Sequence, residues 1–170
     1  IISPIIENGE EKKVRVKTKY HVLIVEDDEE IRNYIAKEFA DKFHIMESCN
    51  GKEALECLET TTVDLIISDI VMPHMDGFEL LKSIRSDNML CHIPFILLSA
   101  LDSIDSKIAG LDYGADAYIE KPFSLNHMKA TINNLLENRR MLFNHFTSVP
   151  NMSYDQTLMN KSDVKWINTV

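Results

Sequence analysis

The chain lacks several features that would assign it to a common functional class. No apolar run approaches the ~20 residues that a membrane-spanning helix requires. No G-x-x-x-x-G-K phosphate-binding loop occurs, and the three cysteines are irregularly spaced, with no C-x-x-C pair of the metal-binding type. The sequence therefore excludes a membrane span, a P-loop enzyme and a paired-cysteine metal site.

Basic residues are too few for nucleic-acid binding driven by overall charge. Lysine and arginine number 18 against 27 acidic residues, which gives a formal net charge of -9. We therefore expect this chain not to bind nucleic acid directly. In a reducing compartment, cysteines without disulfide partners typically behave as small, buried hydrophobic residues. We expect a cytoplasmic domain. The same expectation holds if the parent protein is anchored in a membrane.

Short β-branched runs alternate with helix-length amphipathic segments from His21 onward. Strands are predicted at 21–26, 43–48, 63–68, 94–99 and 116–120, and helices at 28–40, 51–59, 76–86, 103–111 and 124–143. This alternation with short loops predicts an α/β fold in which helices cover both faces of a parallel sheet. Right-handed crossovers leave few topologies, and the flavodoxin-like order 2-1-3-4-5 places strands one and three side by side.

The flanks of this pattern differ in composition. Residues 1–20 are charged and contain helix-breaking residues, which predicts an N-terminal linker. The folded domain is predicted at 21–143 and a second linker at 144–160. Residues 161–170 begin with a helix-start signal, and we expect them to open a truncated C-terminal domain.

Polar side chains stand where four of the predicted strands end. Glu26 and Asp27 follow the first strand, Asp69 the third, Ser99 the fourth and Lys121 the fifth. In an open parallel sheet, side chains beyond the carboxyl ends of the strands converge on one edge, where ligand sites form. Three carboxylates, a hydroxyl and an ammonium at one edge predict a divalent-cation site beside a phosphoryl acceptor.

The chemistry of such a site favours Mg²⁺. This ion binds carboxylates and water, and it neutralises the charge that would repel an anionic phosphoryl donor. Asp69 would be ligand and nucleophile, and Lys121 would pair with it. Each residue also has a plainer interpretation: Asp69 as a turn residue, Glu26–Glu30 as an acidic helix start, Ser99 as a partner of a backbone group, and Lys121 as a solvated side chain. Their joint occurrence favours the site.

Several segments together resemble the receiver domain of two-component response regulators. The resemblance covers about residues 21–142, and the matching segments are VLIVEDD (22–28), DIVMPHMDGFEL (69–80), ILLSA (96–100), GLDYGADAY (110–118) and EKPF (120–123). It implies the five-stranded flavodoxin-like fold. It also implies a phosphorelay switch that catalyses only its own phosphorylation and dephosphorylation, although the parent chain could itself include a histidine kinase.

The resemblance assigns roles to the acidic residues. Asp69 would accept the phosphoryl group from a kinase phosphohistidine. Glu26, Asp27 and Asp69 would hold Mg²⁺ together with the backbone carbonyl of Val71. Glu26 stands where the family more often has aspartate, a common variation within it. No residue that the family requires is missing.

The resemblance also assigns the switch. Ser99, where the family more often has threonine, and Lys121 would contact the bound phosphoryl group. Tyr118 would change rotamer on phosphorylation; the alternative is a half-buried aromatic on an edge strand. The Lys121–Pro122 bond would be cis. The face formed by helix four, strand five and helix five would then change, and an output domain or a second copy would bind there.

The flanks resemble hybrid two-component sensors. Those proteins join a histidine kinase, a receiver and a C-terminal AraC-type helix-turn-helix domain, which residues 162–167 would open here. The kinase would then act in cis; in the alternative, a free-standing regulator, it would act in trans.

Proteins of other classes fit less well. A flavodoxin would not carry the acidic run 26–30 where it binds a phosphate, and an aspartate phosphatase would need D-x-D after the first strand. A receiver-like interaction module that is never phosphorylated remains the alternative function.

Overall fold

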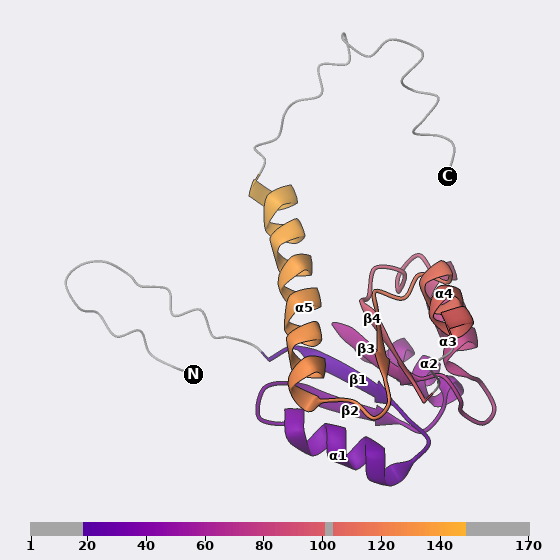
Figure 1. Cartoon of the computed structure of the whole chain (residues 1–170). Coiled ribbons are helices and arrows are strands. Elements are labelled where there is room, and N and C mark those ends of the chain that lie inside the picture. Colours follow the sequence, from indigo (N-terminus) through magenta and orange to yellow (C-terminus); the bar gives the residue numbers. More distant parts are fainter. Residues whose placement is uncertain (1–18, 101–103, 149–170) are drawn as a thin grey trace, which may run out of the picture. The chain divides into compact units, whose positions relative to one another are not determined.

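The computed structural model describes residues 19–100 and 104–148, and five strands alternate with five helices along them. The elements are β1 (His21–Val25), α1 (Glu29–Phe39), β2 (His44–Ser48), α2 (Gly51–Thr60), β3 (Leu65–Asp69), α3 (Gly77–Ser86), β4 (Phe95–Ser99), α4 (Ile104–Asp112), β5 (Ala117–Glu120) and α5 (Leu125–Ser148). All strand pairs are parallel, in the order β2-β1-β3-β4-β5 (Figure 1). The predicted fold class and strand order are confirmed.

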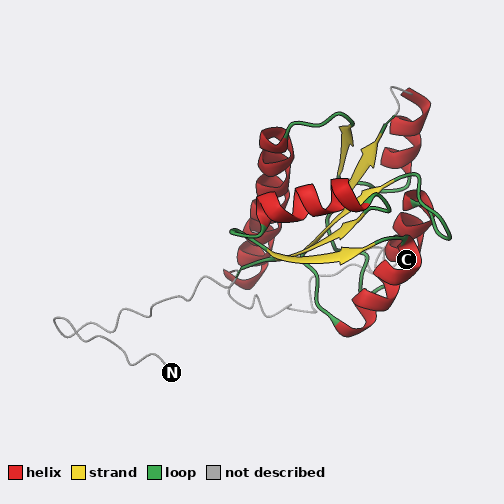
Figure 2. Ribbon diagram, turned by 90° about the horizontal axis from the view of Figure 1, so that it is seen from below, coloured by secondary structure: helices red, strands yellow, loops and turns green. Residues whose placement is uncertain are grey.

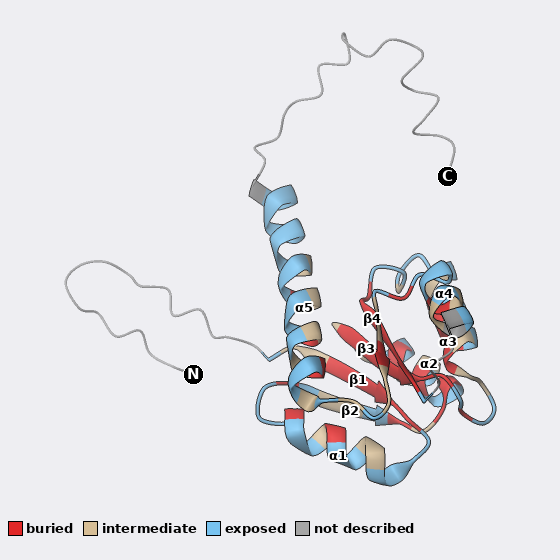
Figure 3. Cartoon of the chain, viewed as in Figure 1, coloured by how far each residue is buried: buried red, intermediate tan, exposed pale blue. Residues whose placement is uncertain are grey.

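Helices cover both faces of the sheet (Figure 2). Alternate residues of β1 enter different cores, as the period of two in a strand requires. Val22 and Ile24 pack with side chains of α1 and α5, whereas Leu23 and Val25 pack with side chains of α2 and α3. Because both faces are covered, the central strands β1, β3 and β4 are mostly apolar and, apart from His21 at the start of β1, buried (Figure 3).

Side-chain caps start the helices that follow β1, β2 and β3. The Asp28 carboxylate accepts hydrogen bonds from the backbone of α1, and the Asn50 side chain does the same for α2. At α3, Asp76 and Glu79 form a reciprocal capping box. These caps set where each chain segment turns away from the carboxyl edge of the sheet. Part of the acidic run after β1 therefore has the plainer role of helix capping.

The last helix is longer than predicted. The amphipathic pattern indicated an end at residue 143, whereas α5 continues to Ser148. Residues 144–148 contain neither glycine nor proline, so the strongest helix breakers are absent from them. The chain divides into two compact units, Ile1–Leu136 and Glu137–Val170, and α5 has residues in both. Residues 144–148 of the predicted second linker are therefore helical, which corrects that prediction. The rest of that linker, the predicted 161–170 segment and most of the predicted N-terminal linker lie outside the described residues.

Across the described ranges, no helix is both long enough and apolar enough to span a lipid bilayer.

Candidate functional site

Strand pairing brings the three predicted carboxylates together. Val25 of β1 lies opposite Ser68 of β3, and the next residues along these strands are Glu26 and Asp69. Oxygen atoms of Glu26, Asp27 and Asp69 lie within 4.8 Å of one another. Glu26 and Asp69 are buried, whereas Asp27 is exposed. This oxygen-only donor set, open on one side, fits a hard cation such as Mg²⁺.

Lys121 bridges the two buried carboxylates. Its Nζ donates to Glu26 Oε2 at 2.8 Å and lies 3.2 Å from Asp69 Oδ1. Its backbone N–H donates to the carbonyl oxygen of Ser99 at 2.6 Å, which ties the end of β5 to the end of β4. The ammonium lies at the acidic edge although two strands, β3 and β4, separate β5 from β1. The Lys121–Pro122 peptide bond is cis.

Burial and mutual charge shift the pKa values of this trio. Burial raises the pKa of Asp69 above its ordinary value, and Lys121 only partly opposes that shift. Burial also raises the pKa of Glu26, opposed by its hydrogen bond to Lys121 and reinforced by the Asp69 charge. For Lys121, burial lowers the pKa, but the contacts with Glu26 and Asp69 outweigh it and the pKa is raised. The site thus favours a charged lysine and disfavours charged carboxylates.

The backbone after β3 holds Asp69 in place. Ile70 N–H donates to Asp69 Oδ1 at 2.9 Å, and Gly77 N–H donates to the Ile70 carbonyl at 2.8 Å. A Cβ atom at Gly77 would lie 2.2 Å from the backbone oxygen of Asp69. Only glycine allows the start of α3 to approach β3 so closely. Val71 lies between them, two residues beyond Asp69, with an exposed side chain.

Ser99 and Tyr118 lie on the β4 and β5 side of the site. Ser99 is the last residue of β4 and is buried. Tyr118 is a half-buried residue of the edge strand β5, as the plainer interpretation expected. Its hydroxyl is buried without a hydrogen-bond partner in the described structure. A buried hydroxyl without a partner costs free energy, so this ring position is not optimal for the tyrosine.

Sequence reasoning missed Arg32. This residue of α1 donates from Nη1 to the backbone oxygen of Glu26 at 2.7 Å. The sequence shows only an arginine in an otherwise ordinary amphipathic helix. A weak signal exists, because the Asp28 cap fixes the start of α1 and so determines which side chains of its second turn face the strand end.

Comparisons with known proteins agree with this geometry. The family model described as "Response regulator receiver domain" matches residues 22–133. The chain is 36% identical over 157 residues to Histidine kinase P4 of Formosa agariphila, covering 92% of this chain and 12% of that protein. It is 35% identical to the response regulator SaeR of Staphylococcus aureus, covering 87% of this chain and 64% of SaeR. The chain thus spans less than two thirds of either relative.

Solved structures show the same likeness. The receiver domain of the Francisella response regulator 1452 superposes with a TM-score of 0.67 and 38% identity, over 71% of this chain and 99% of that domain. The match to the family model covers well over half of the present sequence. The chain therefore belongs to the response regulator receiver domain family.

Proposed function

We propose that this chain accepts a phosphoryl group on Asp69 from the phosphohistidine of a histidine kinase. The observation that supports this most is the position of Lys121, whose ammonium lies between Glu26 and Asp69 at the acidic edge. A module that only binds other proteins has no need of an ammonium beside a buried carboxylate. An acceptor of an anionic group does need one, because the ammonium offsets the added charge.

The transfer assigns each nearby residue a task. An Asp69 oxygen attacks phosphorus while the phosphorus–nitrogen bond to the histidine breaks, and the histidine, whose other ring nitrogen carries a proton, takes the bonding electron pair and leaves as neutral imidazole. Glu26, Asp27 and Asp69, with the Val71 carbonyl, would hold Mg²⁺. When bound, the ion supplies positive charge that offsets these carboxylates and the phosphoryl oxygens. Lys121 and Ser99 would bond the new oxygens.

The added charge would act as a switch. Ser99, drawn toward the phosphoryl group, would pull the loop after β4, and Tyr118 would leave its present position. The unpaired hydroxyl of Tyr118 supports this, because a new position can offer it a partner. Such a local change biases a two-state equilibrium of the surface formed by α4, β5 and α5. An output domain or a second copy of the chain would bind there.

Receiver domains interact with histidine kinases and with output domains, and the relatives suggest two settings. The match to a histidine kinase over 92% of this chain supports a hybrid sensor, with the kinase in cis. In that setting residues 1–20 and the segment between the end of α5 and residue 160 are linkers around the receiver, and residues 161–170 open an AraC-type output domain in a cytoplasmic region. The match to SaeR supports the alternative of a separate regulator with a kinase in trans.

Intact-mass analysis after incubation with acetyl phosphate tests the proposal. We expect one phosphoryl adduct on the wild type with Mg²⁺, and none without Mg²⁺ or on Asp69→Asn. Loss of the adduct in hydroxylamine would identify it as an acyl phosphate. No adduct under any condition, together with no Mg²⁺ uptake in calorimetry, would instead support a receiver-like interaction module that is never phosphorylated.

A further inference from the structure

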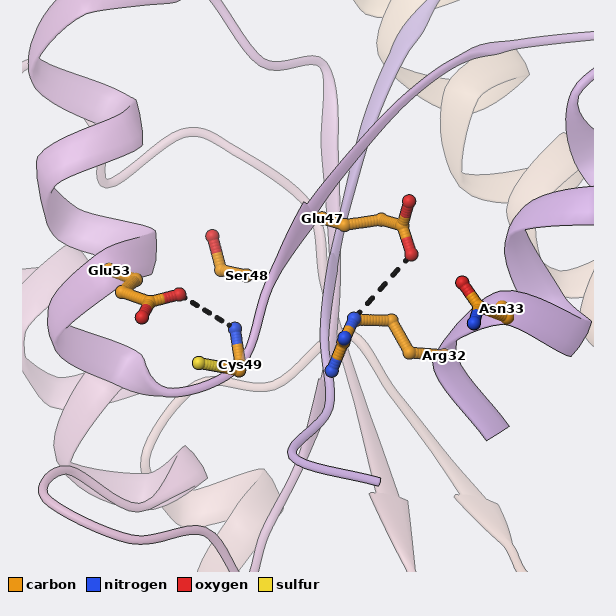
Figure 4. A pocket seen from close by; sticks show the side chains of 6 residues that line it. All are labelled: Arg32, Asn33, Glu47, Ser48, Cys49 and Glu53. Carbon is orange, nitrogen blue, oxygen red and sulfur yellow. Dashed lines mark hydrogen bonds and ion pairs between the residues drawn. The ribbon is translucent and has the colours of Figure 1, made fainter. Parts of the chain in front are cut away.

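Arg32 of α1 contacts the backbone of Glu26, the first carboxylate residue of the site, and not its carboxylate. Its Nη1 donates to the Glu26 backbone oxygen at 2.7 Å, and its Nε lies 3.5 Å from Glu47 Oε1 on β2. Only 17% of the arginine side chain is exposed. Figure 4 shows Arg32 pointing toward Glu47, at a pocket that Ser48 and Cys49 also line. One guanidinium therefore joins α1, the end of β1 and β2.

The Arg32 contact completes the hydrogen bonding of Glu26. The Glu26 N–H donates to the Ser48 carbonyl at 3.1 Å, and its carboxylate oxygens accept from Asp28 N–H at 3.2 Å and from Lys121 Nζ at 2.8 Å. Glu26 is 1% exposed. Without Arg32, the carbonyl of a buried residue would lose its charged donor, which is costly.

The contacted carbonyl belongs to the peptide unit that joins Glu26 to Asp27. Its orientation sets the direction in which the chain leaves β1, and hence where the exposed Asp27 carboxylate lies relative to Glu26 and Asp69. Arg32 uses a backbone oxygen for this, whereas Lys121 uses carboxylate oxygens that a cation would also bind. Arg32 can therefore hold the peptide without competing for the ligand atoms.

We propose that Arg32 is a positioning residue for the cation site: it fixes the Glu26–Asp27 peptide so that the three carboxylates converge. This inference rests on the proposed function and deepens it. Groups that hydrogen-bond to metal-ligating residues are needed for metal affinity even though they never touch the metal. Arg32 is expected to affect Mg²⁺ affinity and to leave the phosphoryl transfer itself unaffected.

The test compares three variants of the full chain by calorimetric titration with Mg²⁺. Arg32→Met keeps an unbranched stem but no donor, and we expect its Mg²⁺ dissociation constant to rise about tenfold. Arg32→Lys restores a charged donor and should lie between Arg32→Met and the wild type. Glu47→Gln is the matched control, because it removes the ion pair of Arg32 but leaves the donor for the Glu26 carbonyl; its affinity should equal that of the wild type.

The acetyl phosphate reaction, followed against Mg²⁺ concentration, supplies a second readout. Arg32→Met should need more Mg²⁺ for half-maximal rate but reach the wild-type rate at saturation. Unfolding midpoints in EDTA show whether each variant is folded. If Arg32→Met does not fold, the inference is tested by Arg32→Lys alone, whose Mg²⁺ dissociation constant must then be higher than that of the wild type.

The outcomes separate the inference from the proposed function. Unchanged Mg²⁺ affinity in folded Arg32→Met, or equal weakening in Glu47→Gln, would overturn the positioning role while wild-type phosphorylation still stands. A wild type that binds no Mg²⁺ and takes up no phosphoryl group would overturn both.

Discussion

Burial makes Asp69 an unfavourable residue for the folded state without a cation. Asp69 is 7% exposed, and burial raises its pKa more than Lys121 can lower it. A carboxyl group whose pKa is raised by folding destabilises the fold once it is ionised. The residue that would carry the chemistry is therefore held in place at a cost in stability, as at many functional sites.

Asp69→Asn should unfold at a higher urea concentration than the wild type at pH 7 in EDTA. Asparagine keeps the oxygen that accepts from Ile70 N–H but carries no charge. The difference should shrink as the pH falls through the raised pKa that Asp69 has in the folded chain, and it should vanish below the ordinary aspartate pKa of 3.8, where the carboxyl group is protonated in both the folded and the unfolded chain.

Asp41→Asn is the control for this comparison, because Asp41 lies in an exposed turn. Its stability should match the wild type. A wild type that is more stable than Asp69→Asn at pH 7 would show that the contact with Lys121 outweighs burial.

At the scale of elements, Arg85 joins the end of α3 to the segments that precede β4 and β5. Its guanidinium donates to the carbonyl oxygens of Cys91, Ile93 and Gly114 at 2.8–3.0 Å, and to Asp116 Oδ2 at 2.9 Å. Gly114 has a φ of 92°, a conformation that suits glycine. One side chain thus fixes two loops at the amino edge of the sheet, away from the functional site.

Arg85→Met should lower the free energy of unfolding by about 2–3 kcal/mol, because it leaves several carbonyl groups without their donor. Arg140→Met is a matched control, since Arg140 pairs with Glu137 one turn away and both side chains are more than half exposed. It should cost less than about 0.5 kcal/mol. Urea denaturation of both variants is the measurement. Equal losses would mean that the Arg85 network contributes no more than an exposed pair.

At the scale of the whole molecule, the candidate cation site exists only when the chain is folded. Asp27 and Asp69 lie on different strand ends and come together through the pairing of β1 with β3. A ligand that binds only the folded state stabilises it in proportion to the logarithm of its concentration. Cation binding at this site would therefore be linked to the stability of the fold.

Mg²⁺ should raise the melting temperature of the wild type, and EDTA should reverse the change. The expected gain is about 2.7 kcal/mol at a concentration one hundred times the dissociation constant. Asp69→Asn should gain less, because it lacks one charged ligand. Its melting curve should therefore lie above that of the wild type in EDTA and approach it or fall below it as Mg²⁺ is added. Scanning calorimetry over a Mg²⁺ series measures this, and an equal gain in both chains would exclude Asp69 from the cation site.

The order and type of the elements can be predicted from the amino-acid sequence alone. Apolar runs and helical periodicity are properties of contiguous segments, so they can be recognised without a structure. The same holds for the polar residues that end β1, β3, β4 and β5, because their place in the chain follows from where each strand stops. Sequence therefore predicted that Glu26, Asp69 and Lys121 converge on one edge.

Which atoms come into contact at this edge of the sheet depends on the tertiary structure. Lys121 contacts Glu26 across 95 residues of sequence, and its bonding to both buried carboxylates follows from how β5 ends beside β4. Arg32 reaches the Glu26 carbonyl only because the cap at Asp28 sets the rotation of α1 over the sheet. The Lys121 contacts depend on the packing of elements distant in the chain, which no local pattern encodes. The Arg32 contact joins neighbouring elements, and the Asp28 cap is its only local signal.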